Sequence, residues 1–188
     1  TSHISRKVRG GLGILPRRLH GAGNLWREKW PHRHVMDRIE QDHEPYHVKI
    51  AHILAQMQSV FGGALLLDLH SMPSVFDQDR RQIGFVIGDR FGRSCDSRYA
   101  ELAAVHFRRG GYHVQTNHPY SGGYILERHG KPARNVHALQ LEVDRALYLD
   151  ESLREPTDAA GPISELIRNC CVMLADQLSG RFQLEAAE

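Results

Sequence analysis

Two short segments of the chain each combine an apolar run with an ionisable residue near its end. Residues 64–69 are almost entirely apolar and are followed by His70, and residues 136–143 form a second apolar run that contains Glu142. Apolar runs of this length are typical of buried β-strands. We therefore expect two core strands, each with a chemically active side chain close to its carboxyl end.

The remainder of the sequence alternates between helical and extended patterns. Apolar residues recur at three- and four-residue steps from Met36 to Val60, and Pro45 should kink or divide this helix because proline lacks a backbone donor. The pattern also predicts strands at residues 83–87, 112–116 and 124–127, helices at residues 96–109 and 163–178, and polar loops at residues 74–81 and 154–161. This alternation predicts the α/β class, with a mixed, largely parallel sheet and helices on both of its faces.

Polar residues follow most of the predicted strands. In an open α/β sheet, ligands bind beyond the carboxyl ends of the strands, and functional loops gather there. The sequence therefore predicts that four polar segments meet at one edge of the sheet, namely residues 70–71, 89–90, 117–124 and 142–145.

Length and composition favour one globular domain over residues 1–188. Of the 188 residues, 41% are hydrophobic and 24% are charged, which is sufficient for a full hydrophobic core. No apolar stretch approaches the ~20 residues of a membrane helix, so we expect no membrane partner. The three cysteines lack the regular spacing of a disulfide framework. We expect Cys170 and Cys171 to be buried and the protein to be cytoplasmic.

Charge is distributed unevenly along the chain. Residues 1–34 contain eight Lys or Arg and one acidic residue, whereas the rest of the chain contains sixteen Lys or Arg and twenty-one acidic residues. Residues 1–23 are also rich in glycine, so we expect a loop-rich basic arm there. Such an arm can bind nucleic acid, but it has no interleaved aromatic stacking motif. Attraction of an anionic substrate explains it equally well, and nucleic acid is the less favoured partner.

His70 and Glu142 are the residues best suited to chemistry. Asp68 lies two positions before His70 on the same strand face, where a carboxylate commonly orients a metal-binding histidine. A carboxylate in an apolar strand has a raised pKa, which suits Glu142 to general acid–base catalysis. Asp144 could position Glu142 or pair with an arginine. The alternatives, a buried histidine and a glutamate in a structural ion pair, remain open on these segments alone.

The loop at residues 117–124 offers flexible backbone and hydrogen-bonding side chains. It contains Ser121 and Tyr124, which are candidates for substrate binding, and Arg128 follows shortly after. Arg128 could bind a substrate carboxylate through two parallel hydrogen bonds; a turn with a surface arginine is the alternative. His43 and His47 have zinc-capable spacing but lack the glutamate of the metalloprotease motif, so we interpret them as a chance pair.

Six ordered motifs lie along the chain: GLGILPR at residues 11–17, PYH at 45–47, DLHSMP at 68–73, GDRFG at 88–92, PYSGGY at 119–124 and LEVDRALY at 141–148. Each motif is modest alone, but the set spans nearly the whole chain and is jointly specific. Together the motifs resemble the N-formylglutamate amidohydrolase family, whose members are similar to zinc carboxypeptidases and aspartoacylases in fold and metal chemistry.

The resemblance implies a metal-dependent hydrolase with a zinc-carboxypeptidase-like (phosphorylase/hydrolase-like) fold. Its substrate would be a small N-acyl amino acid such as N-formyl-L-glutamate, which gives formate and glutamate in histidine catabolism. By this resemblance His70 is a ligand of one zinc ion, and Glu142 is the general base that activates the zinc-bound water and then protonates the leaving amine. Arg128, Tyr124 and Arg90 are candidates for holding the substrate's carboxylates.

One part of the family pattern lies outside the printed sequence. The family's first metal ligands, in a Ser-Pro-His-Ser-Gly-like turn and at a following acidic residue, precede the GLGILPR motif. We therefore expect the C-terminal part of a longer enzyme, with a sheet edge left unpaired by missing strands. A catalytic zinc takes about three protein ligands. If this chain is the entire product, it should bind zinc weakly and release little or no formate. The alternative is a non-catalytic carboxylate-binding relative, and the sequence does not predict the oligomeric state.

Overall fold

A computed structural model describes residues 15–19, 23–28 and 30–180 of the chain. The chain divides into two compact units, residues 1–49 and 50–188, where the sequence predicts one domain. Each unit is described below by itself. Most of the predicted basic arm, together with the first four residues of the GLGILPR motif, lies outside the described residues.

In the first unit, the described residues form a short hairpin and a helical segment. Strand β1 (Arg18–Leu19) pairs antiparallel with β2 (Gly23–Asn24). Helix α2 (His32–Arg38) continues through a π-helical turn, η1 (Ile39–His43), into α3 (Glu44–Phe61), whose residues from Ile50 onward belong to the second unit. The wider turn lies directly before Pro45, where the pattern predicts an interruption, because proline cannot donate the hydrogen bond of a regular α-turn.

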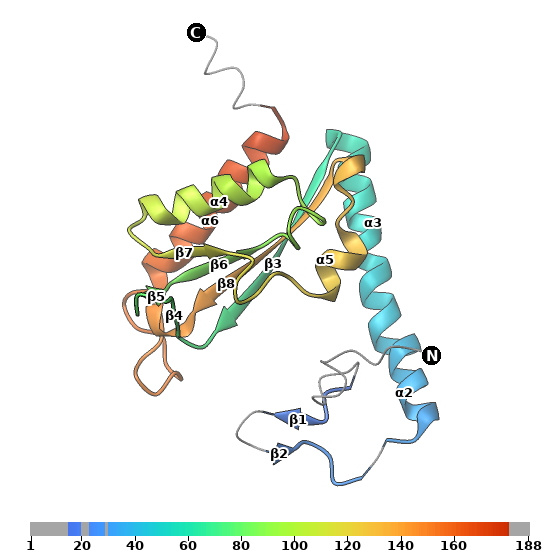
Figure 1. The fold of residues 1–188 in the computed structure, drawn as a ribbon. Coiled ribbons are helices and arrows are strands. Elements are labelled where there is room, and N and C mark those ends of the chain that lie inside the picture. Colours follow the sequence, from blue (N-terminus) through green and yellow to red (C-terminus); the bar gives the residue numbers. More distant parts are fainter. Residues whose placement is uncertain (1–14, 20–22, 29, 181–188) are drawn as a thin grey trace. The chain divides into compact units, whose positions relative to one another are not determined.

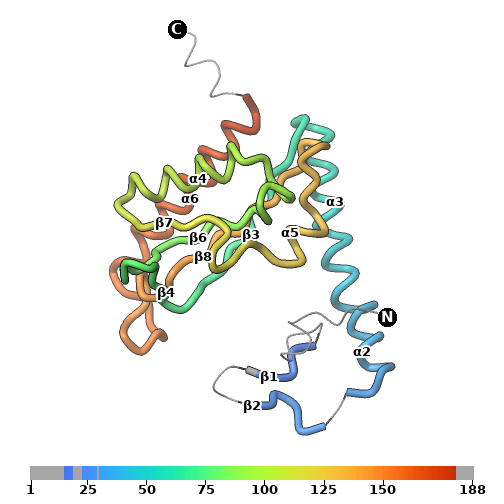
Figure 2. Tube along the Cα trace, in the orientation of Figure 1, coloured from blue at the N-terminus to red at the C-terminus, as the bar shows by residue number. Residues whose placement is uncertain are grey.

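The second unit is built on a four-stranded sheet with the strand order β3–β8–β6–β7 (Figure 1). Its strands are β3 (Ala64–Met72), β6 (Phe85–Gly88), β7 (Val114–Thr116) and β8 (Val136–Asp144). β3 is parallel to β8 and β6 is parallel to β7, whereas β6 is antiparallel to β8. Figure 2 shows that β3 and β8 lie side by side although they are far apart in the sequence.

Helices cover both faces of this sheet. Helices α4 (Ser97–Arg109) and α6 (Ala160–Leu178) pack on one face (Figure 1), over the main core that includes Phe85 and Leu141. On the other face, Leu54 of α3 packs against Ala64 and Val136, and α5 (Tyr124–His129) contacts β8. The predicted α/β class, with a mixed, largely parallel sheet and helices on both faces, is confirmed.

Short elements complete the unit. β4 (Val75–Phe76) pairs antiparallel with β5 (Gln82–Ile83). The 3-10 turns η2 (Pro132–Arg134) and η3 (Arg145–Leu147) lie before and after β8. The hairpin formed by β4 and β5 contradicts the predicted loop at residues 74–81, and the predicted strand at residues 83–87 divides between β5 and β6.

Two further local predictions are wrong. Residues 124–127 begin the helix α5 and are not a strand, because a window of four residues is too short to distinguish a helical from an extended period. Cys170 is buried but Cys171 is exposed. Adjacent residues of a helix point about 100° apart, so the two side chains of α6 cannot both face the core.

The four polar segments do not meet at one edge of the sheet. The carboxyl ends of β3 and β8 lie at one edge, whereas β6 and β7 run the opposite way and end at the other. Hydrophobic patterning is the same for either strand direction, so it could not reveal this reversal. His70 and Glu142 are therefore grouped by the fold, and residues 89–90 and 117–124 approach them from the opposite end of the sheet.

Candidate active site

His70 and Glu142 are paired residues on the parallel strands β3 and β8. Asp68 and Gln140 form the preceding polar pair in the same register, on the same face of the sheet. The His70 Nε2 atom lies 3.0 Å from Asp68 Oδ2, and the Gln140 amide donates a hydrogen bond to Glu142 Oε1 over 2.8 Å. Four polar side chains therefore lie together on two largely apolar strands, as the sequence predicts for three of them.

Glu142 is the most buried of the charged residues in this group. Its exposed fraction is 7%, whereas the His70 side chain is 46% exposed. Burial raises the pKa of the Glu142 carboxyl above its ordinary value, while the charge of His70 and the hydrogen bond from Gln140 act in the opposite direction. A carboxyl group with a raised pKa is suited to accept a proton from water and to return it near neutral pH.

Gln140 is a site residue that the sequence analysis does not identify. Its side-chain nitrogen contacts Glu142, and its side-chain oxygen accepts a hydrogen bond from the backbone of Gly123 over 3.1 Å. Gln140 thus joins the loop at residues 117–123 to the carboxylate. Its position two residues before Glu142, on the same strand face, is the signal that could have identified it.

The loop at residues 117–123 lies against the end of β6. A Cβ atom on Gly88 would lie 2.8 Å from the carbonyl carbon of Ser121, so this close approach requires glycine. The Asn117 amide donates to Asp89 Oδ1 over 2.7 Å, and its oxygen accepts from the Asp89 backbone over 3.0 Å. These contacts hold Ser121 at a fixed place beside the sheet.

The other predicted substrate-binding residues gather around this loop. The Arg90 guanidinium pairs with Glu127 at 3.1 Å, and the Arg90 backbone donates to the Ser121 carbonyl over 2.8 Å. The Arg128 guanidinium donates to the Tyr124 hydroxyl over 3.0 Å. The structure therefore groups Arg90 with Ser121 and Arg128 with Tyr124, on the loop and on α5. Their binding of substrate stays a prediction.

Asp144 is fully buried at the end of β8. Its carboxylate accepts hydrogen bonds from the Ser74 hydroxyl over 3.0 Å, from the Gln82 amide over 2.7 Å and from the Ala146 backbone over 3.0 Å. These bonds connect the β4–β5 hairpin and η3 to the carboxyl end of β8. Asp144 thus holds the segments that surround Glu142, and its predicted direct action on Glu142 stays a prediction.

The described residues supply only part of a metal site. Across residues 15–19, 23–28 and 30–180, no group of three or more His, Cys, Asp or Glu side chains is placed to hold a metal ion. His70, paired with the carboxylate of Asp68, has the arrangement of a single zinc ligand, but a catalytic zinc takes about three. The rings of His43 and His47 lie 4.4 Å apart, and this pair has no third ligand within the described residues.

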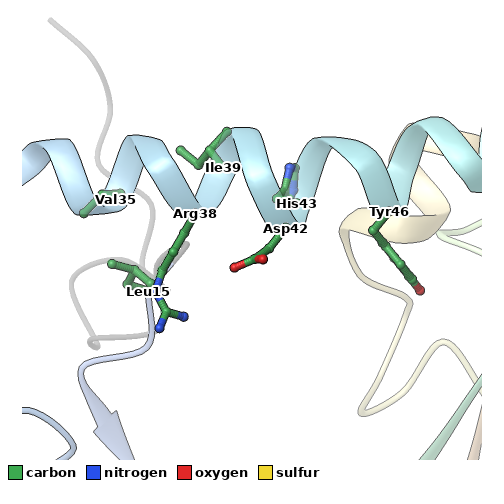
Figure 3. Close-up of a pocket in the computed structure, with 7 residues that line it drawn as sticks. All are labelled: Leu15, Val35, Arg38, Ile39, Asp42, His43 and Tyr46. Atoms are coloured by element: carbon green, nitrogen blue, oxygen red, sulfur yellow. The ribbon is translucent and has the colours of Figure 1, made fainter.

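Among the described residues, several hollows are close to the size of a small-ligand site. One, of about 310 Å³, lies beside the carboxyl end of β3 and is lined by residues that include His70, Tyr148 and Ile163. Another, of about 280 Å³, belongs to the first unit. Figure 3 shows its lining: Leu15 and the helical residues Val35, Arg38, Ile39, Asp42, His43 and Tyr46.

Comparison with known sequences gives consistent matches. The model of the family described as N-formylglutamate amidohydrolase matches residues 2–149. The N-formylglutamate deformylase of Pseudomonas aeruginosa is 41% identical over 112 residues, which are 57% of this chain and 41% of that protein. The N-formylglutamate deformylase of Pseudomonas putida is 33% identical over 154 residues, which are 77% of this chain and 56% of that protein. The chain thus spans about half the length of these curated relatives.

Comparison with solved structures supports the same fold. The crystal structure of N-formylglutamate amidohydrolase from Ralstonia eutropha JMP134 matches with a TM-score of 0.78 and 28% identity, over 94% of this chain and 64% of that chain. A gene product of Agrobacterium tumefaciens matches with a TM-score of 0.62 and 18% identity, over 86% and 63% of the two chains. The second likeness shows the fold alone. Among the described residues, no helix has the length and apolar character to cross a membrane.

Proposed function

The chain belongs to the N-formylglutamate amidohydrolase family, and from this premise we propose that it hydrolyses the amide bond of an N-formyl amino acid such as N-formyl-L-glutamate. The observation that carries the proposal is the pairing of His70 with the buried Glu142 in adjacent strands. The products would be formate and glutamate, which fits a role in histidine catabolism in the cytoplasm. N-acyl groups other than formyl belong to the same reaction class.

In this proposal, Glu142 moves the protons of the reaction. Its carboxylate accepts a proton from the water whose oxygen attacks the formyl carbon, and burial makes it a stronger base by raising its pKa above the ordinary value. The bond between the formyl carbon and the nitrogen then breaks, and Glu142 returns the proton to the leaving amine. Gln140 keeps the carboxylate in place through its hydrogen bond to Oε1.

We also propose that His70 is one ligand of a zinc ion. Its Nε2 atom is paired with Asp68, which leaves Nδ1 as the nitrogen with ligand capacity. When bound, zinc lowers the pKa of a water molecule and polarises a carbonyl. The described residues do not complete such a site, so the remaining ligands would have to come from outside the described residues.

A carboxylate of the substrate would contact the group of residues around the loop at 117–123. Arg90 and Arg128 carry the positive charge there, and Ser121 and Tyr124 carry hydroxyl groups. Arginine binds a carboxylate through two parallel hydrogen bonds. Glu127, the ion-pair partner of Arg90, lies on the surface, so exchange of this partner for a substrate carboxylate costs little.

The test is release of formate from N-formyl-L-glutamate in the presence of excess zinc, which compensates for weak binding of the metal. We expect Glu142→Gln to abolish the release, because the amide cannot take up the proton. Glu165→Gln changes an exposed glutamate of α6 and should leave the rate unchanged. Equal rates for the chain and for Glu142→Gln would remove Glu142 from the proposed role.

A second candidate function is binding of carboxylate ligands without catalysis. It is favoured by one observation, the lack of a complete set of metal ligands within the described residues. The same assay separates the two candidates. A chain that binds N-formyl-L-glutamate in calorimetry but releases no formate with excess zinc is a binding protein, whereas release that depends on Glu142 identifies an enzyme.

A further inference from the structure

Arg145, directly after β8, has no hydrogen-bond partner for a buried donor. Its Nε atom is buried and finds no acceptor among the described residues. Its guanidinium forms no ion pair with a carboxylate of the described residues, in contrast to Arg90, which pairs with Glu127. An unsatisfied buried donor costs about 1–3 kcal/mol, so such a group in a native protein calls for an explanation, for example a ligand.

The backbone at Arg145 is held in a defined turn. Asp144 accepts a hydrogen bond from the Ala146 backbone over 3.0 Å, and the Arg145 carbonyl accepts from the backbone of Leu149 over 2.9 Å. Because Asp144 is paired with Met72 of β3, this turn lies at the same sheet edge as His70 and Glu142. The side chain of Arg145 therefore starts from a fixed position beside the candidate site.

The charge of Arg145 acts on the candidate base. Together with the larger effect of His70, it opposes the rise of the Glu142 pKa that burial causes. Arg90 and Arg128, by contrast, belong to the group around the loop and have partners of their own. Arg145 is thus a cation whose charge acts on Glu142 and whose buried Nε donor has no acceptor among the described residues.

The chemistry of the proposed substrate specifies which anion lies closest to the base. In an N-formyl amino acid, the α-carboxylate is attached to the same carbon atom as the amide nitrogen that Glu142 would protonate. We propose, on the basis of the function proposed above, that Arg145 binds the α-carboxylate of the substrate and so orients the formyl amide toward Glu142. The planar guanidinium provides paired donors for a carboxylate. Arg145 would then serve any N-formyl amino acid, whatever its side chain.

Three ligands test this proposal: N-formyl-L-glutamate, N-formyl-L-glutamine, which lacks only the side-chain carboxylate, and the α-carboxamide of N-formyl-L-glutamate. Their affinities are measured by calorimetry in a Glu142→Gln background, where turnover is blocked. Arg145→Gln should weaken binding of the first two ligands roughly 10- to 100-fold and leave the α-carboxamide almost unaffected. Arg145→Lys should give an intermediate loss because it keeps the charge without the fork.

Arg168→Gln is the matched control, because Arg168 lies on the surface of α6 in an exposed pair with Glu165; it should change none of the affinities. Three results would overturn the proposal. Arg145→Gln could weaken the binding of all three ligands equally, or it could leave the affinity for N-formyl-L-glutamate unchanged. The third is that no ligand binds while Arg145 is intact. These binding measurements need no turnover. If the ligands bind with the expected dependence on Arg145 but the unsubstituted chain releases no formate, only the proposed hydrolysis is refuted. Release of formate that does not depend on Arg145 would refute only the role of Arg145.

Discussion

His137 shows how one buried side chain makes stability depend on pH. It is 1% exposed on β8; its Nδ1 atom accepts a hydrogen bond from the Asp96 backbone over 3.2 Å, and its Nε2 atom lies 3.0 Å from Asn135 Oδ1. Burial lowers the pKa of His137 below 6.5, although the charge of Asp96 acts the other way. The folded protein therefore holds the neutral ring, and protonation would remove the acceptor that Asp96 uses.

The sign of this effect follows from the proton balance. Below about pH 6.5, the unfolded chain binds a proton that the folded chain excludes, so the free energy of unfolding should fall with decreasing pH until the folded-state pKa is passed. The slope from one such group is at most about 1.4 kcal/mol per pH unit. Urea denaturation between pH 7.5 and 5 measures it. His137→Gln should show a shallower dependence than the unsubstituted chain, and parallel curves would contradict the prediction.

At the scale of elements, α4 depends on its N-terminal cap. The Asp96 side chain accepts a hydrogen bond from the Arg98 backbone over 3.0 Å, and the helix that begins there buries Tyr99, Ala103 and Phe107 in the core. We expect Asp96→Ala to lower the free energy of unfolding by about 1 kcal/mol, because the first turn loses an acceptor for its free donors.

Asp96→Asn is the matched control for this prediction, because asparagine keeps the acceptor and removes the charge. It should remain within a few tenths of a kcal/mol of the unsubstituted chain. If the two variants were equally destabilised, the ion pair between Asp96 and Arg98, at 3.0 Å, would explain the stability and the cap would not.

Elements with a long regular period could be predicted from the sequence, and short ones could not. The apolar runs at β3 and β8 and the periodic faces of α4 and α6 predict those four elements because each spans several repeats of its pattern. Helix α5 has six residues, fewer than two full turns, and its four-residue window resembles a strand. The direction of β6 could not be predicted either, because reversal of a strand leaves its apolar pattern intact.

The same distinction applies to the candidate site. Asp68, His70 and Glu142 could be predicted because the two-residue period of a strand places them on one face and the motifs indicate their chemistry. The spacing of Gln140 before Glu142 marks a shared strand face, but its link to the loop, the hydrogen bond to Gly123, could not be predicted. The burial of the Arg145 Nε atom could not be predicted either. Contacts between distant segments leave no signal in a single sequence.

For the whole molecule, the supply of metal ligands is the property that decides how zinc is held. Within the described residues, His70 has the arrangement of one ligand and no cluster of three potential ligands exists. Structural zinc sites with full sets of ligands bind the metal by roughly 10–16 kcal/mol, and one imidazole provides only a fraction of this. We therefore expect the chain to lose zinc during desalting and to show clearly less than one zinc ion per chain by mass spectrometry.

The zinc that does bind should depend on His70. A ligand that binds only the folded chain raises its stability once the ligand concentration exceeds the dissociation constant. Added zinc should therefore raise the unfolding midpoint of the unsubstituted chain more than that of His70→Ala. His52→Ala, which removes an exposed histidine of α3, should respond like the unsubstituted chain. One zinc ion per chain that survives desalting and disappears in His70→Ala would contradict weak binding, because it requires ligands beyond those that the described residues bring to His70. Retention of that zinc in His70→Ala would instead remove His70 from the proposed metal site.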